Sequence, residues 1–221
     1  MNVYVVVEGR VVEKAAYRVW IPQVNNALTY AALPPDVVGD NRFLIVSGNG
    51  YPQYFEVIRR ALEDVAADNT FQRLVICIDS EDMTLAEKRT EVEQFIQETE
   101  YAYVDYRIVV QHFCFETWAL GNRRIARKNP QDASLLKYRR HYNVLKLDPE
   151  GLPAPPNGDL TRSQLAERYF RATVNDKNRN LTYSKHKPDV VTHPKFFPEV
   201  RARLEDTAHI QSFQAFLNAF V

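Results

Sequence analysis

The chain has 221 residues, and its 28 lysines and arginines balance its 28 aspartates and glutamates, so the formal net charge is zero. A hydrophobic fraction of 45% is enough to build the core of one ordinary domain with an appendage, and no apolar run reaches the length of a membrane span. Only two cysteines occur, Cys77 and Cys114, which excludes a disulfide framework and a cysteine-rich zinc site. The first residues lack the pattern of a signal peptide, so we expect a cytoplasmic protein without membrane association.

The first 125 residues alternate between apolar runs and segments of helical spacing. Runs rich in β-branched residues predict strands at 2–7, 43–46, 71–78 and 106–110. Apolar residues at helical spacing predict helices at 13–24, 54–67, 83–98 and 115–127. Continuous apolar runs are typical of parallel strands buried on both faces. The sequence therefore predicts an α/β fold with an open, mostly parallel sheet flanked by helices.

The organisation changes after residue 128. Residues 147–159 contain four prolines and two glycines, which predicts an extended loop. Residues 161–170 and 197–220 have the composition and spacing of helices. We therefore expect an α/β domain at 1–128, followed at 129–221 by a basic linker and a C-terminal helical elaboration packed on that domain.

Acidic residues follow two of the predicted strands. Glu8 comes directly after the first strand, and Asp79, Glu81 and Asp82 follow the third. In open parallel sheets, ligands bind outside the carboxyl ends of the strands, so these side chains are expected to converge on one cleft. Their mutual repulsion would be relieved by Mg²⁺, which prefers carboxylate oxygens. The alternative interpretation is that such acids cap helices or face water.

Three motifs of this sequence resemble the Toprim fold, the catalytic core of topoisomerases, primases and the overcoming-lysogenization-defect nucleases. The first is Val7-Glu8-Gly9-Arg10, with Glu13 and Tyr17 after it; the second is Ile78-Asp79-Ser80-Glu81-Asp82; and the third is Phe115-Glu116-Thr117-Trp118-Ala119-Leu120. Among Toprim proteins, the sequence more closely resembles small proteins of the RloB type and the Toprim subunits of bacterial anti-phage systems. The resemblance covers about residues 1–125, and a weaker resemblance is found around residues 183–187. One departure is that the usual Asp-x-Asp motif is here Asp79-Ser80-Glu81, which leaves open whether Glu81 or Asp82 is the second ligand.

The resemblance implies a Mg²⁺- or Mn²⁺-dependent endonuclease. Glu8 would act as general base or metal ligand and Asp79 as metal ligand, while Glu13 and Glu81 could complete a second metal site. Two such ions stabilise the attacking and leaving oxygens of a phosphodiester during hydrolysis. Lys185 could offset charge that develops on the scissile phosphate, although a solvated surface lysine is the simpler interpretation.

Charge is distributed unevenly along the chain. Residues 1–110 hold 10 lysines and arginines against 17 acids, whereas residues 111–221 hold 18 against 11. A basic second half is what a nucleic-acid substrate requires, although charge can also segregate by chance. The candidate phosphate contacts are six residues of one basic stretch interleaved with tyrosines: Arg123, Arg124, Arg127, Lys128, Arg139 and Arg140. An exposed helix-loop without a ligand would account for this stretch equally well.

The leading hypothesis is a toxic nuclease of an anti-phage defence system that cuts DNA or RNA, with tRNA among the candidate targets. The resemblance further suggests control by an ABC- or AAA-type ATPase partner, and the sequence is also compatible with an oligomer. The first alternative is a catalytically degenerate Toprim subunit that acts as an assembly or regulatory partner of such an ATPase. The second is a phospho-accepting receiver domain, although Glu8-Gly9 fits its paired acids poorly. The sequence contains no Gly-Lys-Ser/Thr motif, so the chain is not expected to be a P-loop ATPase, and its five histidines lack the spacing of a zinc site.

Overall fold

The computed structural model describes residues 1–67, 70–155 and 158–221. Two compact units make up the chain. Unit 1 consists of Met1–Ile78, Leu85–Val110 and Ala215–Val221, and unit 2 of Asp79–Thr84 and Gln111–Gln214. This division differs from the predicted boundary at residue 128, because the chain leaves the first unit earlier and returns to it at the end. Part of the predicted 147–159 loop, residues 156–157, lies outside the described residues.

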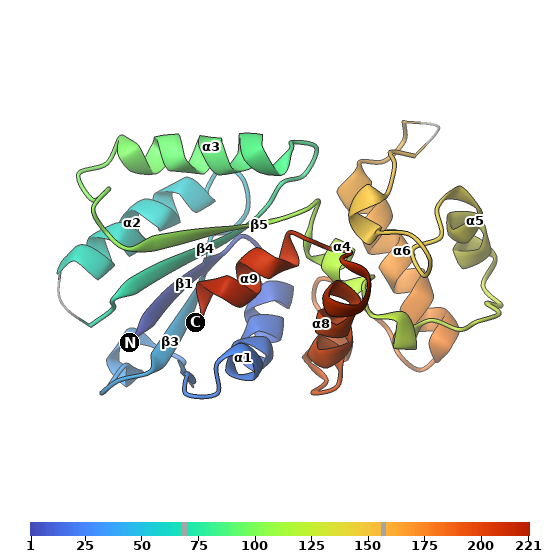
Figure 1. Cartoon of the computed structure of the whole chain (residues 1–221), viewed down its shortest axis with the longest axis horizontal. Helices are drawn as coiled ribbons and strands as arrows, with labels where there is room; N and C mark the ends of the chain where they lie inside the picture. Colours follow the sequence, from blue (N-terminus) through green and yellow to red (C-terminus); the bar gives the residue numbers. More distant parts are fainter. Residues whose placement is uncertain (68–69, 156–157) are drawn as a thin grey trace. The chain divides into compact units, whose positions relative to one another are not determined.

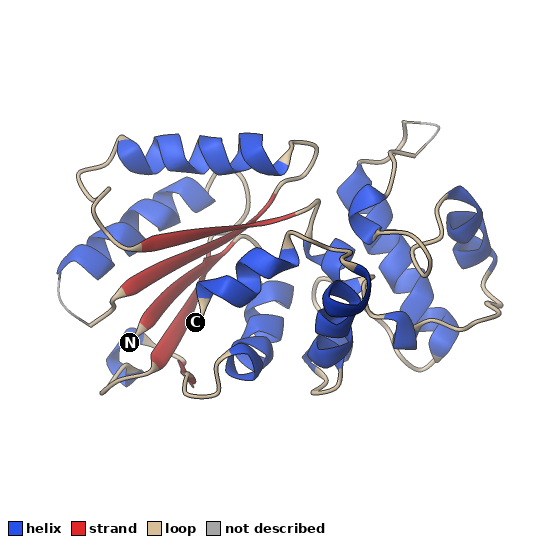
Figure 2. Ribbon diagram, in the orientation of Figure 1, coloured by secondary structure: helices blue, strands red, loops and turns tan. Residues whose placement is uncertain are grey.

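The sheet of unit 1 has the open parallel form that the apolar runs predict. Its strands are β1 (Val3–Val7), β2 (Thr29–Ala31), β3 (Arg42–Ser47), β4 (Arg73–Asp79) and β5 (Tyr106–Gln111), and their order in the sheet is β2-β3-β1-β4-β5 (Figures 1 and 2). In the central pairings, Val7 of β1 lies opposite Ser47 of β3 and Cys77 of β4. The last residues of β4 and β5, Asp79 and Gln111, belong to unit 2. The α/β fold class is confirmed.

Helices cover both faces of this sheet (Figure 1). The helices α2 (Tyr54–Ala67) and α3 (Leu85–Gln97) lie on one face, and α1 (Val12–Val24) and the last residues of α9 (Phe213–Ala219) on the other. On the first face, Tyr4 and Val6 of β1 share a buried cluster with Ile58 and Leu62 of α2. That helix forms because its buried residues recur at three- and four-residue spacing.

The second face is closed by aromatic side chains. Phe216 of α9 contacts Tyr17 of α1, with ring centroids 4.6 Å apart, and meets Trp20 edge-on at 6.2 Å. The end of the chain is also fixed through its backbone, because the Arg73 guanidinium donates to the carbonyl oxygens of Ala219 and Val221 at 3.1 and 3.0 Å. Phe216, Ala219 and Phe220 are therefore part of the core of unit 1.

Unit 2 is helical. It contains α4 (Phe115–Ala119), α5 (Ala133–His141), α6 (Arg162–Lys177), α7 (Asp189–Thr192) and α8 (Phe196–Thr207), together with the 3₁₀ turns η2 (Arg123–Ile125) and η3 (Pro149–Gly151); a third such turn, η1 (Pro34–Asp36), lies in unit 1. Side chains define where the longer helices begin. Asp132 caps α5 by accepting from the Leu135 N–H at 2.8 Å, and Thr161 with Gln164 forms a capping box at the start of α6.

Three predicted elements differ from the observed ones, and one observed strand was not predicted. The helix expected at 115–127 ends at Ala119, and a Cβ atom on Gly121 would lie 2.8 Å from the Trp118 carbonyl oxygen, so the chain turns at a point where only glycine fits. The helix expected at 197–220 is broken into α8 and α9, because Ala208 and Ile210 have positive φ. Helix α6 is longer than the predicted 161–170, and the short strand β2 was not predicted. Within the described ranges, no helix is long and apolar enough to cross a membrane.

Candidate functional site

The turn after β1 holds the first acidic pair within unit 1. The Glu8 N–H donates to the Cys77 carbonyl oxygen at 3.0 Å, and the Glu8 carbonyl oxygen accepts from the Gly50 N–H at 3.0 Å. The Glu8 backbone is therefore fixed at the carboxyl edge of the sheet. Glu13 is buried, with 7% of its surface exposed, and its carboxylate packs against Gly9. A Cβ atom at Gly9 would lie 2.1 Å from Glu13 Oε2, so glycine is required there.

Unit 1 adds a tyrosine, a lysine and a glutamate that the sequence analysis missed. Tyr54, at the start of α2, donates to Glu91 Oε2 at 3.3 Å, and the buried ammonium of Lys88 bonds to the same carboxylate at 2.7 Å. Burial, followed by the negative charges of Glu91 and Glu8, raises the pKa of Tyr54 above its ordinary value. The signal was present, because Lys88 falls on the inward-facing positions of a polar helix between Leu85 and Val92.

Asp79 is the centre of a buried polar cluster in unit 2. It is 7% exposed, and its Oδ1 accepts a hydrogen bond from Gln111 Nε2 at 2.7 Å. Gln111 is fully buried, and its carbonyl oxygen accepts from the Ser80 N–H at 2.9 Å. The Ser80 hydroxyl is 2.8 Å from His112 Nδ1. The ends of β4 and β5 are thus linked through both backbone and side chains, which holds the Asp79 carboxylate in one position.

Lys185 interacts electrostatically with Asp79 of this cluster and with Glu116. Glu116 is 2% exposed and accepts from the Tyr183 hydroxyl at 2.7 Å. Partial burial acts to lower the pKa of Lys185, but the negative charges of Glu116 and Asp79 outweigh it and raise the pKa above its ordinary value. The lysine is therefore charged at neutral pH and lies in the field of two buried carboxylates. The sequence predicted Asp79 and Lys185 separately, and the fold of unit 2 brings them together.

Two neighbouring groups, Cys114 and His112, are uncharged at neutral pH. Burial, with the charges of Glu116 and Asp79, raises the pKa of the Cys114 thiol well above its usual range, so it stays protonated. Burial and the nearby Arg162 lower the pKa of His112, which keeps the imidazole neutral.

The remaining predicted ligands are exposed. Glu81 has a positive φ of 50° and donates its N–H to the Phe113 carbonyl oxygen at 2.9 Å. Asp82 forms an ion pair with Arg162 at 3.6 Å, and the same guanidinium donates to the Asp82 carbonyl oxygen at 3.1 Å. Arg162 therefore competes with a metal ion for Asp82, whereas Glu81 has no ion pair within the described ranges.

Most of the predicted nucleic-acid contacts have protein partners. Arg123 pairs with Asp206 at 3.0 Å and Arg124 with Glu199 at 2.9 Å. The Arg127 guanidinium donates to the Lys177 carbonyl oxygen at 3.4 Å. In the part of the chain that the structure describes, Lys128 and Arg140 are exposed and make no ion pair.

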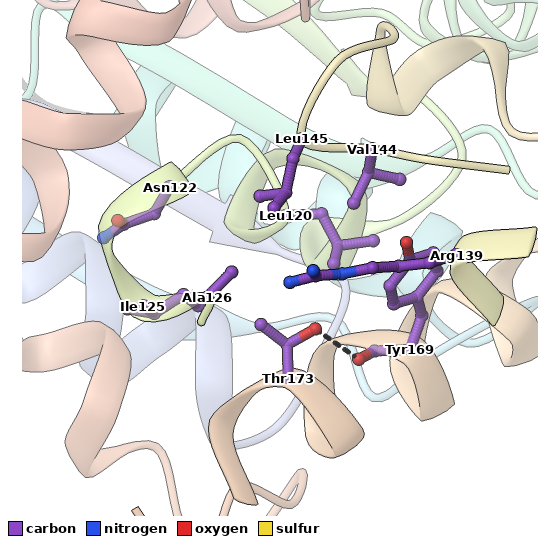
Figure 3. A pocket seen from close by; sticks show the side chains of 9 residues that line it. All are labelled: Leu120, Asn122, Ile125, Ala126, Arg139, Val144, Leu145, Tyr169 and Thr173. Carbon is purple, nitrogen blue, oxygen red and sulfur yellow. Dashed lines mark hydrogen bonds between the residues drawn. The ribbon is translucent and has the colours of Figure 1, made fainter. Parts of the chain in front are cut away.

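Arg139 lines a small cavity of unit 2 (Figure 3). Its side chain extends across the cavity between Leu145 and Tyr169, and its guanidinium donates to the carbonyl oxygen of Lys128 at 3.2 Å. A cavity of about 10 Å³ has room for no more than about one water molecule, so it is not a ligand site. Arg139 therefore holds the backbone of residues 127–128 in place by hydrogen bonds.

Carboxylate oxygens are the donors that Mg²⁺ prefers. The predicted ligands have this donor type: Glu8 and Glu13 in unit 1, and Asp79 and Glu81 in unit 2. Among the described residues, no three histidine, cysteine, aspartate or glutamate side chains form a ready-made metal site. Comparison with protein-family models, with curated proteins and with solved structures gave no match to this chain.

Proposed function

We infer that the chain is a metal-dependent hydrolase of nucleic-acid phosphodiester bonds, of the Toprim type that its motifs resemble. The observation that carries this proposal is Asp79, a buried carboxylate at the end of a parallel strand, oriented by Gln111 and in the field of the Lys185 ammonium. Open parallel sheets bind their ligands at this edge. A buried carboxylate near a charged lysine is also a frequent feature of catalytic sites.

Glu8 enters the proposal through the strand register. Val7 and Cys77 are opposite each other on neighbouring strands, and Glu8 and Asp79 follow them by one and two residues. The resemblance implies Glu8 and Asp79 as oxygen donors for Mg²⁺ or Mn²⁺, with Glu13 and Glu81 as further donors. The bound ion would supply electrostatic stabilisation of the attacking and leaving oxygens.

The protein's own groups have separate roles in this proposal. Gln111 positions the Asp79 carboxylate through its 2.7 Å hydrogen bond. Lys185, which is partly exposed to solvent, would offset negative charge on the phosphate as the bond breaks. Tyr183 holds Glu116 in place through a hydrogen bond. Together with Asp79, the Glu116 carboxylate keeps Lys185 positively charged.

The proposed biological setting follows from the resemblance alone. The substrate would be DNA or RNA, and the nuclease would be the toxic effector of an anti-phage system under the control of an ATPase partner. Co-purification of the chain with an ABC- or AAA-type ATPase encoded beside it would support this assignment.

A cleavage assay tests the chemistry. Purified protein with Mg²⁺ or Mn²⁺ is expected to nick plasmid DNA or cleave tRNA, and Glu8→Ala and Asp79→Ala are each expected to reduce the rate by about 100-fold or more. Asp40→Ala is the matched control, because Asp40 is an exposed acid that precedes β3 at the opposite edge of the sheet. Equal cleavage by the wild type, Glu8→Ala and Asp79→Ala would refute the proposed chemistry.

One observation favours the alternative of a non-catalytic subunit. Asp79 already accepts a hydrogen bond from Gln111 and interacts with the positive charge of Lys185. Isothermal titration calorimetry separates the two proposals. No heat of Mg²⁺ or Mn²⁺ binding, together with a stable complex between the chain and its ATPase, would favour the assembly role.

A further inference from the structure

We propose that a pocket formed by α5, α6 and the chain before α6 binds a single phosphorylated nucleotide. The proposal rests on the nucleic-acid function above and names the part of the substrate that unit 2 recognises. The lining side chains that matter are two cations, Lys137 and Arg168, the imidazole of His141, and three apolar groups, Tyr138, Leu160 and Leu165. We call this the α5–α6 pocket. Its volume of about 280 Å³ suits one nucleotide rather than a duplex.

The basic side chains of the pocket, Lys137, His141 and Arg168, come from two helices. Lys137 and His141 are four residues apart on α5, so they lie on the same face of that helix. Arg168 is on α6, which packs against α5 through the rings of Tyr138 and Tyr169, with centroids 5.5 Å apart. A phosphate entering the pocket would therefore meet positive charge from both helices.

These cations differ from their neighbours because they are not engaged by acids. Arg171 pairs with Glu167, and Arg162 pairs with Asp82. Within the described ranges, neither Lys137 nor Arg168 makes an ion pair. The one acid among the described lining residues, Asp159, is exposed and forms no ion pair with those residues. The pocket thus has excess positive charge, which an anion would compensate.

The apolar groups provide a surface for a base. Leu165 is buried, and Leu160 and Tyr138 are half-buried, so the pocket has a partly desolvated wall. The ring of Tyr138 is held in place by Tyr169. Bases bind such aromatic and aliphatic surfaces with little regard to sequence, whereas arginine recognises phosphate through paired hydrogen bonds. A phosphate next to an apolar ring system is the ligand chemistry that matches both parts of the pocket.

Helix α6 connects this pocket to the Asp79 cluster. Glu167, the residue before Arg168, is one of the acids that raise the pKa of Lys185. A nucleotide bound in the pocket would therefore contact α6, the helix whose Glu167 also interacts electrostatically with Lys185.

Binding is measured on the full chain in EDTA, so that no cleavage takes place. The probes are a fluorescein-labelled single-stranded oligonucleotide and, as competitors, AMP, adenosine and inorganic phosphate. We expect AMP to compete better than either adenosine or phosphate. We expect Arg168→Glu and Lys137→Glu each to weaken binding by at least about tenfold, because each removes a charge-assisted contact and adds repulsion. Arg201→Glu is the control from α8, since Arg201 is exposed, pairs with Glu205 at 2.8 Å and is absent from the described lining of the pocket.

Each outcome decides the proposal. Unchanged binding by Arg168→Glu and Lys137→Glu, equal competition by AMP and adenosine, or no binding by the wild type would overturn it. If AMP binds while the oligonucleotide does not, the pocket takes free nucleotides instead of a nucleotide within a strand. Asp79→Ala separates the two proposals, because it is expected to abolish cleavage and to keep the oligonucleotide bound. Both charge-reversed residues are exposed, and thermal unfolding checks that the variants are folded.

Discussion

At the scale of single residues, Gly9 combines a tight turn with a close contact. The carboxylate of Glu13 occupies the space in which any side chain at this position would lie. The buried Glu13 would have to rotate away from a larger residue and lose its present environment. The glycine is therefore needed to keep that acid in place, independently of whether a metal ion binds.

Gly9→Ala is expected to lower the free energy of unfolding by about 1–3 kcal/mol, because the new methyl group overlaps with the Glu13 carboxylate. Urea unfolding of the single and double variants measures this cost. In the background of Glu13→Ala the same substitution is expected to cost almost nothing, since the clashing atoms are gone. An equal cost in both backgrounds would mean that the backbone of the turn, and not the carboxylate, requires glycine.

At the scale of structural elements, η3 holds a half-buried acid, Glu150, whose ionisation is linked to stability. Glu150 accepts a hydrogen bond from the Ser212 N–H at 3.1 Å, and the Ser212 oxygen accepts from Trp118 Nε1 at 2.7 Å. Burial raises the pKa of Glu150 to about 7, although the hydrogen bonds from Ser212 act against this. The folded chain therefore keeps a proton that the unfolded chain releases near pH 4.5.

Since the folded state holds this proton between about pH 4.5 and 7 and the unfolded state does not, the Glu150 contribution to stability falls as the pH rises through that window. Above about pH 7 both states are charged and the loss is complete. Glu150→Gln is expected to remove this part of the pH dependence, as measured by urea unfolding from pH 4.5 to 8. Glu205→Gln, on the exposed face of α8, is the control. A Glu150→Gln profile parallel to that of the wild type would contradict the expectation.

Elements with strong periodicity were predictable from the sequence, and those that depend on distant contacts were not. Helix α2 was predicted at its observed bounds because its apolar residues recur regularly, and β1 and β4 were recognised from β-branched runs. The end of α4 depends on the close approach of Ile210 to Gly121, which no local pattern reveals. Likewise, Asp79 could be chosen as a candidate, but its partner Gln111 follows from the pairing of β4 with β5.

At the scale of the whole molecule, the excess of basic residues after residue 110 leads to a prediction about salt. If residues of unit 2 contact phosphates, the oligonucleotide association constant should fall steeply with salt concentration, because bound counterions are released. Arg168→Gln is expected to reduce the slope of the log–log plot by about one. Arg60→Gln is the control from unit 1, because Arg60 pairs with Glu56 on α2. A slope that is the same in all three proteins would assign the phosphate contacts to other residues.

The return of residues 215–221 to unit 1 limits how the gene can be dissected. A fragment that stops at Val110 would lack Phe216 and leave the rings of Tyr17 and Trp20 open to water on one side of the sheet. Arg73 would also lose the two carbonyl groups that it bonds at the chain end. A protein fragment that ends at Val110 would therefore be prone to aggregate. Point substitutions in the intact chain are the better way to assign properties to either unit.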